Sequence, residues 1–198
     1  MNSFSLFDFY KIKKKQIKQK LKEFSRIKEN DIFYELCFCI LTPQSSAMKC
    51  WKAVEYLKRK SFLEKCFNPE ACLRKAGVRF YKNKSCYLLE ARKMFPLRLP
   101  RDSFAARELL VKNIKGLGYK EASHFLRNIG YKGLAILDRH ILKNLKEFGI
   151  IKEIPKTLAR KRYLEIESKF MTFSKKIKIP IDELDLLFWC KETGEVFK

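Results

Sequence analysis

The sequence predicts an all-α protein, and three observations lead to this prediction. Apolar residues recur at helical spacing, as Tyr10, Ile17, Leu21 and Phe24 do near the start. Capping residues, prolines and glycines divide the chain into segments of helical length. Alternation of apolar and polar residues, which marks a strand, hardly occurs. With 198 residues, 46% of them apolar, the chain can form one globular unit or two small lobes.

The helices before residue 114 follow from these signals in order. In the first predicted helix, lysines cover the faces outside the apolar stripe, which is typical of a basic surface exposed to solvent. Asp31 is expected to cap a central buried helix, because residues 32–41 are apolar nearly all round, and Thr42-Pro43 should end it. The predicted helices are residues 10–24, 32–41, 44–60, a short helix between Asn68-Pro69 and Gly77, then 83–95 and, after the Pro96/Pro100 linker, 102–113.

Residues 78–84 differ from their surroundings because they are short, basic and aromatic. They are too charged to predict a core element, and we expect a loop. No Asp or Glu stands between Glu70 and Glu90, so this loop should carry an undiluted positive field.

The most informative stretch is residues 114–123, Ile-Lys-Gly-Leu-Gly-Tyr-Lys-Glu-Ala-Ser. Gly116 and Gly118 predict a tight hairpin between two helices, and the second helix would present backbone N–H groups to a phosphate. A helix end followed by an ordinary turn explains many such glycine pairs. Lys120 lies near the N-terminus of the second helix, which disfavours an ammonium charge, so it is a candidate amine nucleophile. Lys115 is the alternative lysine.

The second helix of the hairpin should bury Ala122 and Phe125 and end near Gly130. Asp138 is the notable residue after this helix. Apolar residues 134–137 precede Asp138, and a helical apolar pattern follows, so it occupies an N-cap position. Capping alone explains an aspartate there. Because a capping carboxylate is fixed in place, it can also be directed into a cleft. Two later helices are predicted, one starting at Pro155 and one at Asp182.

The charge of the chain points to a polyanionic partner. Forty-four Lys and Arg residues against 22 Asp and Glu residues leave a net charge of +22, far more than solubility requires. Nucleic acid is therefore the expected partner. An RNA-binding or ribosome-associated protein remains an alternative on charge alone.

Seven cysteines show neither a CxxC pair nor a histidine spaced for zinc. Most have apolar neighbours, which predicts reduced thiols packed as small apolar groups. The start, Met1-Asn2-Ser3-Phe4, lacks the layout of a signal peptide, and no apolar run approaches membrane-spanning length. We expect a cytoplasmic protein with no membrane contact.

Residues 114–122 together with Asp138 resemble the signature of the helix-hairpin-helix DNA glycosylase superfamily. Within it, the chain most resembles the archaeal-type (type 2) 8-oxoguanine DNA glycosylase/AP lyases, over most of its length. The segments that carry this resemblance are Glu35–Thr42, Arg79–Tyr81, Lys120–Asn128, Asp138–Leu142, Ile154–Leu158 and the ending Trp189, Thr193-Gly194 and Lys198.

The resemblance implies a catalytic pair. Lys120 would attack C1′ of the damaged nucleotide, release the base and form a Schiff base with the opened sugar, after which β-elimination cuts the strand. Asp138 would stabilise positive charge on the sugar and relay a proton. No redox or organic cofactor is expected. Iron–sulfur relatives carry four closely spaced cysteines late in the chain, where this sequence has only Cys190, so no cluster is expected either.

Other residues are expected to contact double-stranded DNA. Arg79 and Phe80, a planar cation beside an aromatic ring, suit an intercalating probe, although Phe80 packed beneath its loop is the ordinary alternative. Gln44 is a second gap-filling candidate, because related glycosylases place Gln or Asn at this turn. The residues expected to grip the DNA backbone are Lys115, Gly116 and Gly118.

Base recognition is expected at the end of the chain. The resemblance implies that the terminal Lys198 separates 8-oxoguanine from guanine, and Trp189 is a candidate to stack on the extruded base, with an ordinary core position as its alternative. The backbone carbonyls that would hold a monovalent cation, as hairpins of this superfamily often do, are those of Lys112, Ile114 and Leu117.

The expected architecture is two interleaved helical lobes with a cleft between them. One lobe comprises residues 31–133 and ends in the hairpin, and the other comprises residues 1–30 and 134–198. We expect a monomeric enzyme that excises 8-oxoguanine from DNA and nicks the strand. Two alternatives stay open: a glycosylase of the same fold for another damaged base, and a non-enzymatic helix-hairpin-helix module that binds DNA.

Overall fold

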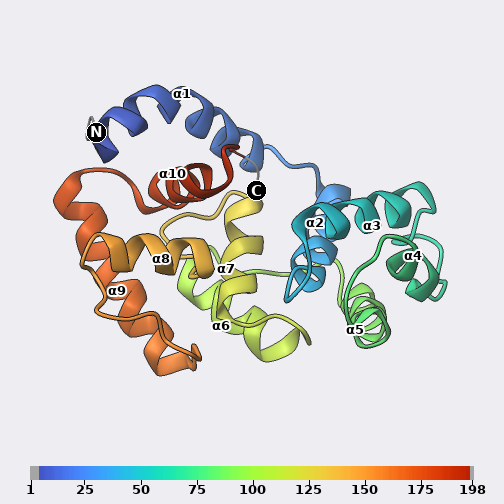
Figure 1. Cartoon of the computed structure of the whole chain (residues 1–198). Helices are drawn as coiled ribbons and strands as arrows, with labels where there is room; N and C mark the ends of the chain where they lie inside the picture. The colour runs from blue at the N-terminus through green and yellow to red at the C-terminus, as the bar shows by residue number, and fades with distance from the viewer. Residues whose placement is uncertain (1–4, 197–198) are drawn as a thin grey trace. The chain divides into compact units, whose positions relative to one another are not determined.

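Ten α-helices and no strand make up residues 5–196, the part of the chain that this computed structural model describes (Figure 1). The prediction of an all-α protein is confirmed. Within these residues no helix has the length and hydropathy that spanning a bilayer requires. The helices are α1 (Leu6–Phe24), α2 (Glu29–Leu41), α3 (Ala47–Arg59), α4 (Glu70–Lys75), α5 (Tyr81–Lys93), α6 (Ser103–Asn113), α7 (Tyr119–Asn128), α8 (Arg139–Glu147), α9 (Arg160–Ile177) and α10 (Ile181–Thr193).

The chain forms two compact units. The central unit comprises residues 27–129, and the terminal unit combines the described parts of residues 1–26 and 130–198. The central unit therefore contains α2 to α7, whereas the terminal unit contains α1 and α8 to α10. The predicted lobes place these boundaries at 31 and 133 rather than at 27 and 129.

Helix α2 is the middle of the central unit, where it packs against α3, α5 and α7. Every residue from 33 to 41 is buried, as the apolar composition of this helix predicts. The Phe38 ring makes T-shaped contacts with Trp51 of α3 and His124 of α7, at centroid distances of 5.9 and 5.7 Å. Such contacts add to hydrophobic burial worth about 2 kcal/mol for each large apolar side chain.

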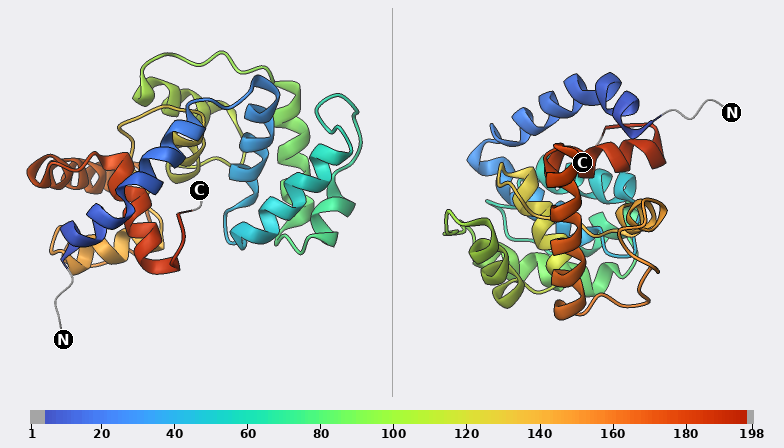
Figure 2. Two further views of the ribbon diagram at one scale, coloured as in Figure 1. Left: turned by 90° about the horizontal axis from the view of Figure 1, so that it is seen from above. Right: turned by 90° about the vertical axis from the view of Figure 1, so that its left-hand side faces the viewer.

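Helix α10 is the middle of the terminal unit, where α1, α8 and α9 pack against it. Figure 1 shows α1, blue, beside α10, red, and Figure 2 shows the same unit from two other directions. Ile17 of α1 is fully buried, and the Tyr10 hydroxyl donates to the Glu183 carboxylate over 2.5 Å. Phe188 stacks on Phe170 of α9 with 5.9 Å between centroids. The two ends of the described chain therefore share one core.

The predicted cap of α2 was wrong. The helix begins at Glu29, its N-cap is Lys28 without a side-chain capping bond, and Asp31 lies in the first turn. The Asp31 carboxylate pairs with Lys58 of α3 instead. An acidic residue in the first turn still interacts favourably with the helix dipole.

Other predicted helix starts also differ from the structure. Helix α3 begins at Ala47, because Gln44 has a φ of 54° and left-handed backbone cannot belong to a right-handed helix. Helix α5 begins at Tyr81, two residues before the predicted start, so part of the predicted loop 78–84 is helical. Helix α9 begins at Arg160 rather than at Pro155.

All seven cysteines are free thiols, and five of them are buried. This agrees with the prediction that most pack as small apolar groups. Burial raises the pKa of Cys50 to about 11, although the Lys84 ammonium works in the opposite direction. The Cys50 thiol is therefore neutral at physiological pH and donates to the Leu41 carbonyl over 3.1 Å.

Candidate active site

The predicted glycine hairpin joins α6 to α7. Gly116 has a φ of +87°, and a Cβ at this position would lie 2.7 Å from Cδ2 of Tyr87, so only glycine fits without a shift. Gly118 is the N-cap of α7 and supplies no side-chain oxygen to the N–H groups of the first turn. The start of α7 therefore has the character of an anion-binding site.

Side chains of both helices fix the hairpin angle. The Tyr119 hydroxyl lies 2.7 Å from each carboxylate oxygen of Glu108 and donates to this carboxylate. The buried Arg107 guanidinium lies 5.1 Å from the Tyr119 ring centroid and 5.3 Å from that of Phe104. It also donates to the Ser123 hydroxyl over 3.1 Å. These contacts hold α7 against α6 next to the hairpin.

Lys120 is the second residue of α7, and its side chain is 26% exposed. Its Nζ atom lies 3.0 Å from Oε1 of Glu121, whose side chain is 13% exposed. Lys115, the alternative lysine, is 66% exposed and pairs with Glu90 over 3.2 Å. The partly shielded lysine at the helix N-terminus is therefore Lys120, and its amine is not sealed in the interior.

The far end of α7 is anchored by a buried polar chain that sequence analysis missed. The Asn128 amide donates to Oε1 of Glu35 over 2.7 Å, and Arg127 donates to Oδ1 of Asn128 over 2.9 Å. All three residues are buried in the central unit. A lone Glu within the apolar segment of α2 was the available signal, because a buried carboxylate requires such partners.

The predicted DNA-probing residues Arg79, Phe80 and Gln44 lie on two loops of the central unit. The Phe80 side chain is 52% exposed, and the Arg79 guanidinium lies 5.4 Å from its ring centroid. Phe80 is therefore not packed beneath its loop. The backbone N–H of Arg79 donates to the Ser45 hydroxyl over 3.0 Å, which joins the two loops.

Lys84 corrects the expectation that residues 78–84 form an exposed basic loop. It is 4% exposed, and its ammonium donates to the carbonyls of Leu41 and Pro43 and to the Ser45 hydroxyl. Burial lowers the pKa of Lys84, and the nearby Arg79 and Lys120 cations lower it further, whereas the Glu121 carboxylate raises it. Its spacing from the buried Leu88 was the sequence signal.

Asp138 is the N-cap of α8 in the terminal unit, as predicted. Its Oδ1 atom accepts hydrogen bonds from the backbone N–H groups of His140 and Ile141, both at 2.8 Å. Because both capping bonds go to Oδ1, Oδ2 takes no part in the cap. Capping therefore fixes the carboxylate and leaves one oxygen for a second role.

Side chains also hold the extended segment that leads to Asp138. The N–H of Ala135 donates to the Glu167 carboxylate over 2.9 Å, and the Ala135 carbonyl accepts from the Tyr163 hydroxyl over 2.6 Å. The N–H of Gly133 donates to the Asp182 carboxylate. Residues 134–137 are buried outside any helix, so their backbone groups require such partners. The predicted helices that start at Pro155 and Asp182 gave no indication of this role.

Trp189 of α10 is half-buried, and its ring lies 4.9 Å from the His140 ring in a T-shaped contact. Trp189 is thus neither a fully buried core residue nor an isolated surface residue. His140 follows Asp138 by two positions, so the contact connects the capping aspartate to Trp189 through α8. Asp138 and Trp189 consequently belong to one packed region of the terminal unit.

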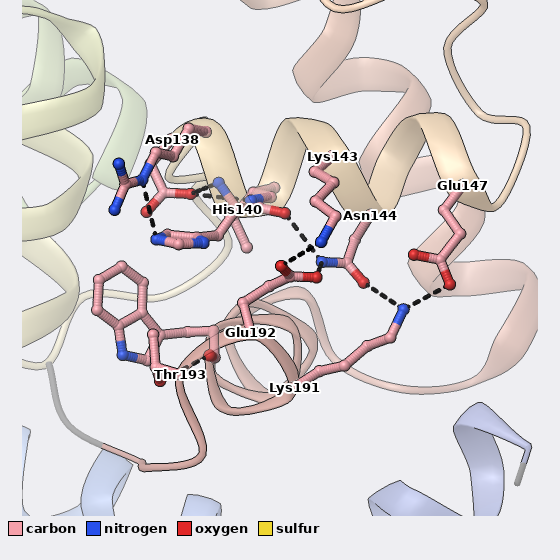
Figure 3. A network of polar contacts seen from close by, with 11 residues as sticks. Asp138, His140, Lys143, Asn144, Glu147, Lys191, Glu192 and Thr193 are labelled. Atoms are coloured by element: carbon pink, nitrogen blue, oxygen red, sulfur yellow. Dashed lines mark hydrogen bonds and ion pairs between the residues drawn. The ribbon is translucent and has the colours of Figure 1, made fainter.

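A polar network holds α8 and α10 together beside this region (Figure 3). The Glu192 carboxylate accepts from Lys143 over 2.7 Å and from Asn144 over 3.2 Å. Lys191 donates to Asn144 over 3.0 Å and to Glu147 over 2.6 Å. The Lys143 hydrogen bond lowers the pKa of Glu192, although burial opposes it. The network fixes the last turn of α10, just after Trp189.

Several predictions stay open. Lys198, expected to recognise the base, lies outside the described residues. Lys120 belongs to the central unit and Asp138 to the terminal unit, and their pairing remains a prediction. Among the hairpin carbonyls expected to hold a cation, that of Ile114 accepts the Leu117 N–H over 3.3 Å.

Comparison with known proteins gives consistent matches along nearly the whole chain. The family described as 8-oxoguanine DNA glycosylase matches residues 15–179. The 8-oxoguanine DNA glycosylase/AP lyase of Fusobacterium nucleatum is 47% identical over 204 residues, which cover 96% of this chain and 94% of the relative.

Two solved structures are similar over the same extent. The 8-oxoguanine DNA glycosylase of Thermotoga maritima has a TM-score of 0.88 and 35% identity, covering 98% of this chain and 96% of its own. The 8-oxoguanine glycosylase/lyase of Methanocaldococcus jannaschii, in complex with a 15mer DNA containing 8-oxoguanine, has a TM-score of 0.81 and 36% identity, covering 98% and 99%.

Proposed function

The chain belongs to the 8-oxoguanine DNA glycosylase family, and we propose that Lys120 and Asp138 are its catalytic pair. The protein is a bifunctional DNA-repair enzyme, an 8-oxoguanine DNA glycosylase and AP lyase, as its relatives are named. One observation carries the assignment of the nucleophile. Lys120 is a partly shielded lysine in the first turn of α7, directly after the Gly118 N-cap.

The reaction begins when the neutral amine of Lys120 attacks C1′ of the damaged nucleotide. The bond between C1′ and N9 breaks, and its electron pair leaves with the base, which takes up a proton. Opening of the sugar ring then gives a Schiff base between Lys120 and C1′. The imine acidifies the C2′ proton, and loss of this proton expels the 3′ phosphate and cuts the strand.

Asp138 stabilises the positive charge that develops on the sugar during bond cleavage. Its geometry supports this role, because the two capping bonds hold Oδ1 and leave Oδ2 outside the cap. The half-buried position of Asp138 adds support, since a fixed carboxylate away from bulk water acts more strongly on a developing cation.

DNA is held through its backbone at the hairpin and opened by the two adjacent loops. The N-terminus of α7, with Gly116, Gly118 and Lys115, binds a phosphate. Arg79, Phe80 and Gln44 enter the stack where the nucleotide has left. Exposure of the Phe80 ring supports this proposal.

Trp189 and Lys198 receive the extruded base. The half-buried Trp189 ring suits stacking on it, and Lys198 offers an ammonium to separate 8-oxoguanine from guanine. Both proposed catalytic residues come from one chain, so a monomer suffices.

Excision assays on two matched duplexes test the substrate. The proposal predicts release of 8-oxoguanine from one duplex and little or no release of thymine glycol from the other. A preference for thymine glycol would contradict it in favour of a same-fold enzyme for oxidised pyrimidines.

Deleting Lys198 should impair base excision and spare cleavage at a preformed abasic site, whereas equal loss of both activities would contradict its recognition role.

A further inference from the structure

Lys84 is a buried cation whose hydrogen-bond partners lie at the last residue of α2 and on the connection from α2 to α3. Its Nζ atom donates to the Leu41 carbonyl at 2.7 Å, to the Pro43 carbonyl at 2.8 Å and to the Ser45 hydroxyl at 3.0 Å. Three acceptors match the three donors of an ammonium group. The side chain therefore forms a complete set of hydrogen bonds while it is 4% exposed.

These bonds tie together the two loops that carry the proposed DNA-probing residues. Gln44 lies between Pro43 and Ser45, two of the Lys84 partners. The Ser45 hydroxyl also accepts from the backbone N–H of Arg79 over 3.0 Å. Lys84 itself lies in the first turn of α5, four residues after Phe80, whose carbonyl accepts the Lys84 N–H over 3.0 Å. One side chain thus connects both loops to one helix.

Both loops contain a residue in strained backbone. Gln44 has a φ of 54° and Phe80 a φ of 56°, and they are two of the four non-glycine residues with positive φ in the described chain. Such conformations persist only where surrounding contacts hold them, and they cluster at functional sites. The Lys84 bonds to Pro43 and Ser45 flank Gln44 directly, and the Ser45 bond to Arg79 acts on the residue before Phe80.

Burying the Lys84 ammonium is energetically unfavourable if its role is only to stabilise the fold. Taking an ammonium out of water is unfavourable, and the nearby Arg79 and Lys120 cations add repulsion, which together lower the pKa of Lys84. An apolar side chain of similar length would avoid both costs. What it would lack is the set of directed bonds to the α2–α3 connection.

We propose that Lys84 is a positioning residue that holds Gln44 and the Arg79-Phe80 pair in the conformation that opens the base stack. This inference rests on the proposed function, in which these residues fill the gap left by the extruded nucleotide. The proposal predicts a selective effect on base excision. Lys84 should matter for excising a stacked base and much less at a preformed abasic site, where no base has to be extruded.

The test compares Lys84→Met with Lys82→Met, which removes the same charge from an exposed lysine two residues away. Single-turnover 8-oxoguanine excision by Lys84→Met should fall by about tenfold or more, while its cleavage of a preformed abasic site stays within about threefold of wild type. Lys82→Met should retain the wild-type ratio of the two rates. Fluorescence of 2-aminopurine next to the lesion should report slower stack opening in Lys84→Met.

A loss of both activities by the same factor in folded Lys84→Met would overturn the proposal, as would an unchanged excision rate. Thermal unfolding establishes that the variant is folded. Where Lys84→Met does not fold, Ser45→Ala decides, because it removes the hydroxyl that joins Lys84 to Arg79. It should lower excision selectively, and a wild-type ratio would overturn the proposal. Failure of the proposed function appears separately, as wild-type protein that excises no 8-oxoguanine.

Discussion

The ammonium of Lys120 lies 3.0 Å from the carboxylate of Glu121, its neighbour in the first turn of α7. The Glu121 side chain is only 13% exposed, and a Cβ added at Gly118 would lie 3.1 Å from its Oε2 atom. The carboxylate is thus folded over the start of the helix, where the helix dipole favours it. The proposed nucleophile therefore carries its own counter-ion before DNA arrives.

Asp138→Asn separates capping from catalysis. Asparagine caps a helix about as well as aspartate, so the free energy of unfolding should change by less than about 0.5 kcal/mol. Base excision should nevertheless fall by about a hundredfold or more, because the anion near the sugar is lost. Urea denaturation and single-turnover excision measure the two effects.

Asp102→Asn is the matched control, since Asp102 caps α6 through a 2.7 Å bond to the Ala105 N–H. It should keep both stability and activity. Full activity in Asp138→Asn would show that Asp138 acts only as a helix cap.

Gly116→Ala should destabilise the protein by about 2 to 4 kcal/mol, because it combines left-handed backbone with a clash against Tyr87. Gly149→Ala isolates the backbone contribution, since Gly149 has a φ of +70° and no atom within 4 Å of an added Cβ. Its cost should be about 1 kcal/mol. Denaturant midpoints measure both costs. Equal costs would show that the ring of Tyr87 moves aside.

Glu192→Gln should make stability less dependent on pH in the acid range. The Lys143 hydrogen bond lowers the pKa of Glu192 below its ordinary value of 4.5. The stabilising contribution is therefore complete above that value and is lost as the pH falls through the lowered pKa. The Tm of wild type should exceed that of Glu192→Gln at pH 7, and the difference should shrink in acid.

Glu165→Gln provides the comparison for this prediction. The pKa of Glu165 is also lowered, by hydrogen bonds from Lys169 and Arg162, but the group lies at the surface. Exposed pairs of this kind contribute little, so its Tm should match wild type at both pH values. A difference for Glu192→Gln that persists undiminished in acid would contradict the account of the α8–α10 network.

Local signals in the sequence predicted the helices and the hairpin well. Glycine at 116 and 118, and aspartate before an apolar helical pattern at 138, act through contacts a few residues away. The structure confirms the hairpin and the cap for that reason. Lys28 rather than Asp31 precedes α2, however, because several adjacent residues can begin a helix and packing selects among them.

Contacts between distant segments could not be predicted in the same way. Lys84 fell in the predicted basic loop 78–84 and was not expected in the core, since its acceptors at Leu41, Pro43 and Ser45 lie on a segment far back in the chain. The bond from Asn128 to Glu35 was missed for the same reason. Polar side chains become buried where the fold brings partners to them, and hydrophobic periodicity carries no record of those partners.

Borohydride trapping on an 8-oxoguanine duplex tests the central claim most directly. Wild type and Lys115→Gln should give a covalent protein–DNA adduct, and Lys120→Gln should give none while its salt-sensitive DNA binding persists. An adduct that survives in Lys120→Gln and disappears in Lys115→Gln would contradict the assignment of the nucleophile. Wild-type protein that binds the duplex and traps nothing would contradict the catalytic account as a whole, in favour of a DNA-binding module.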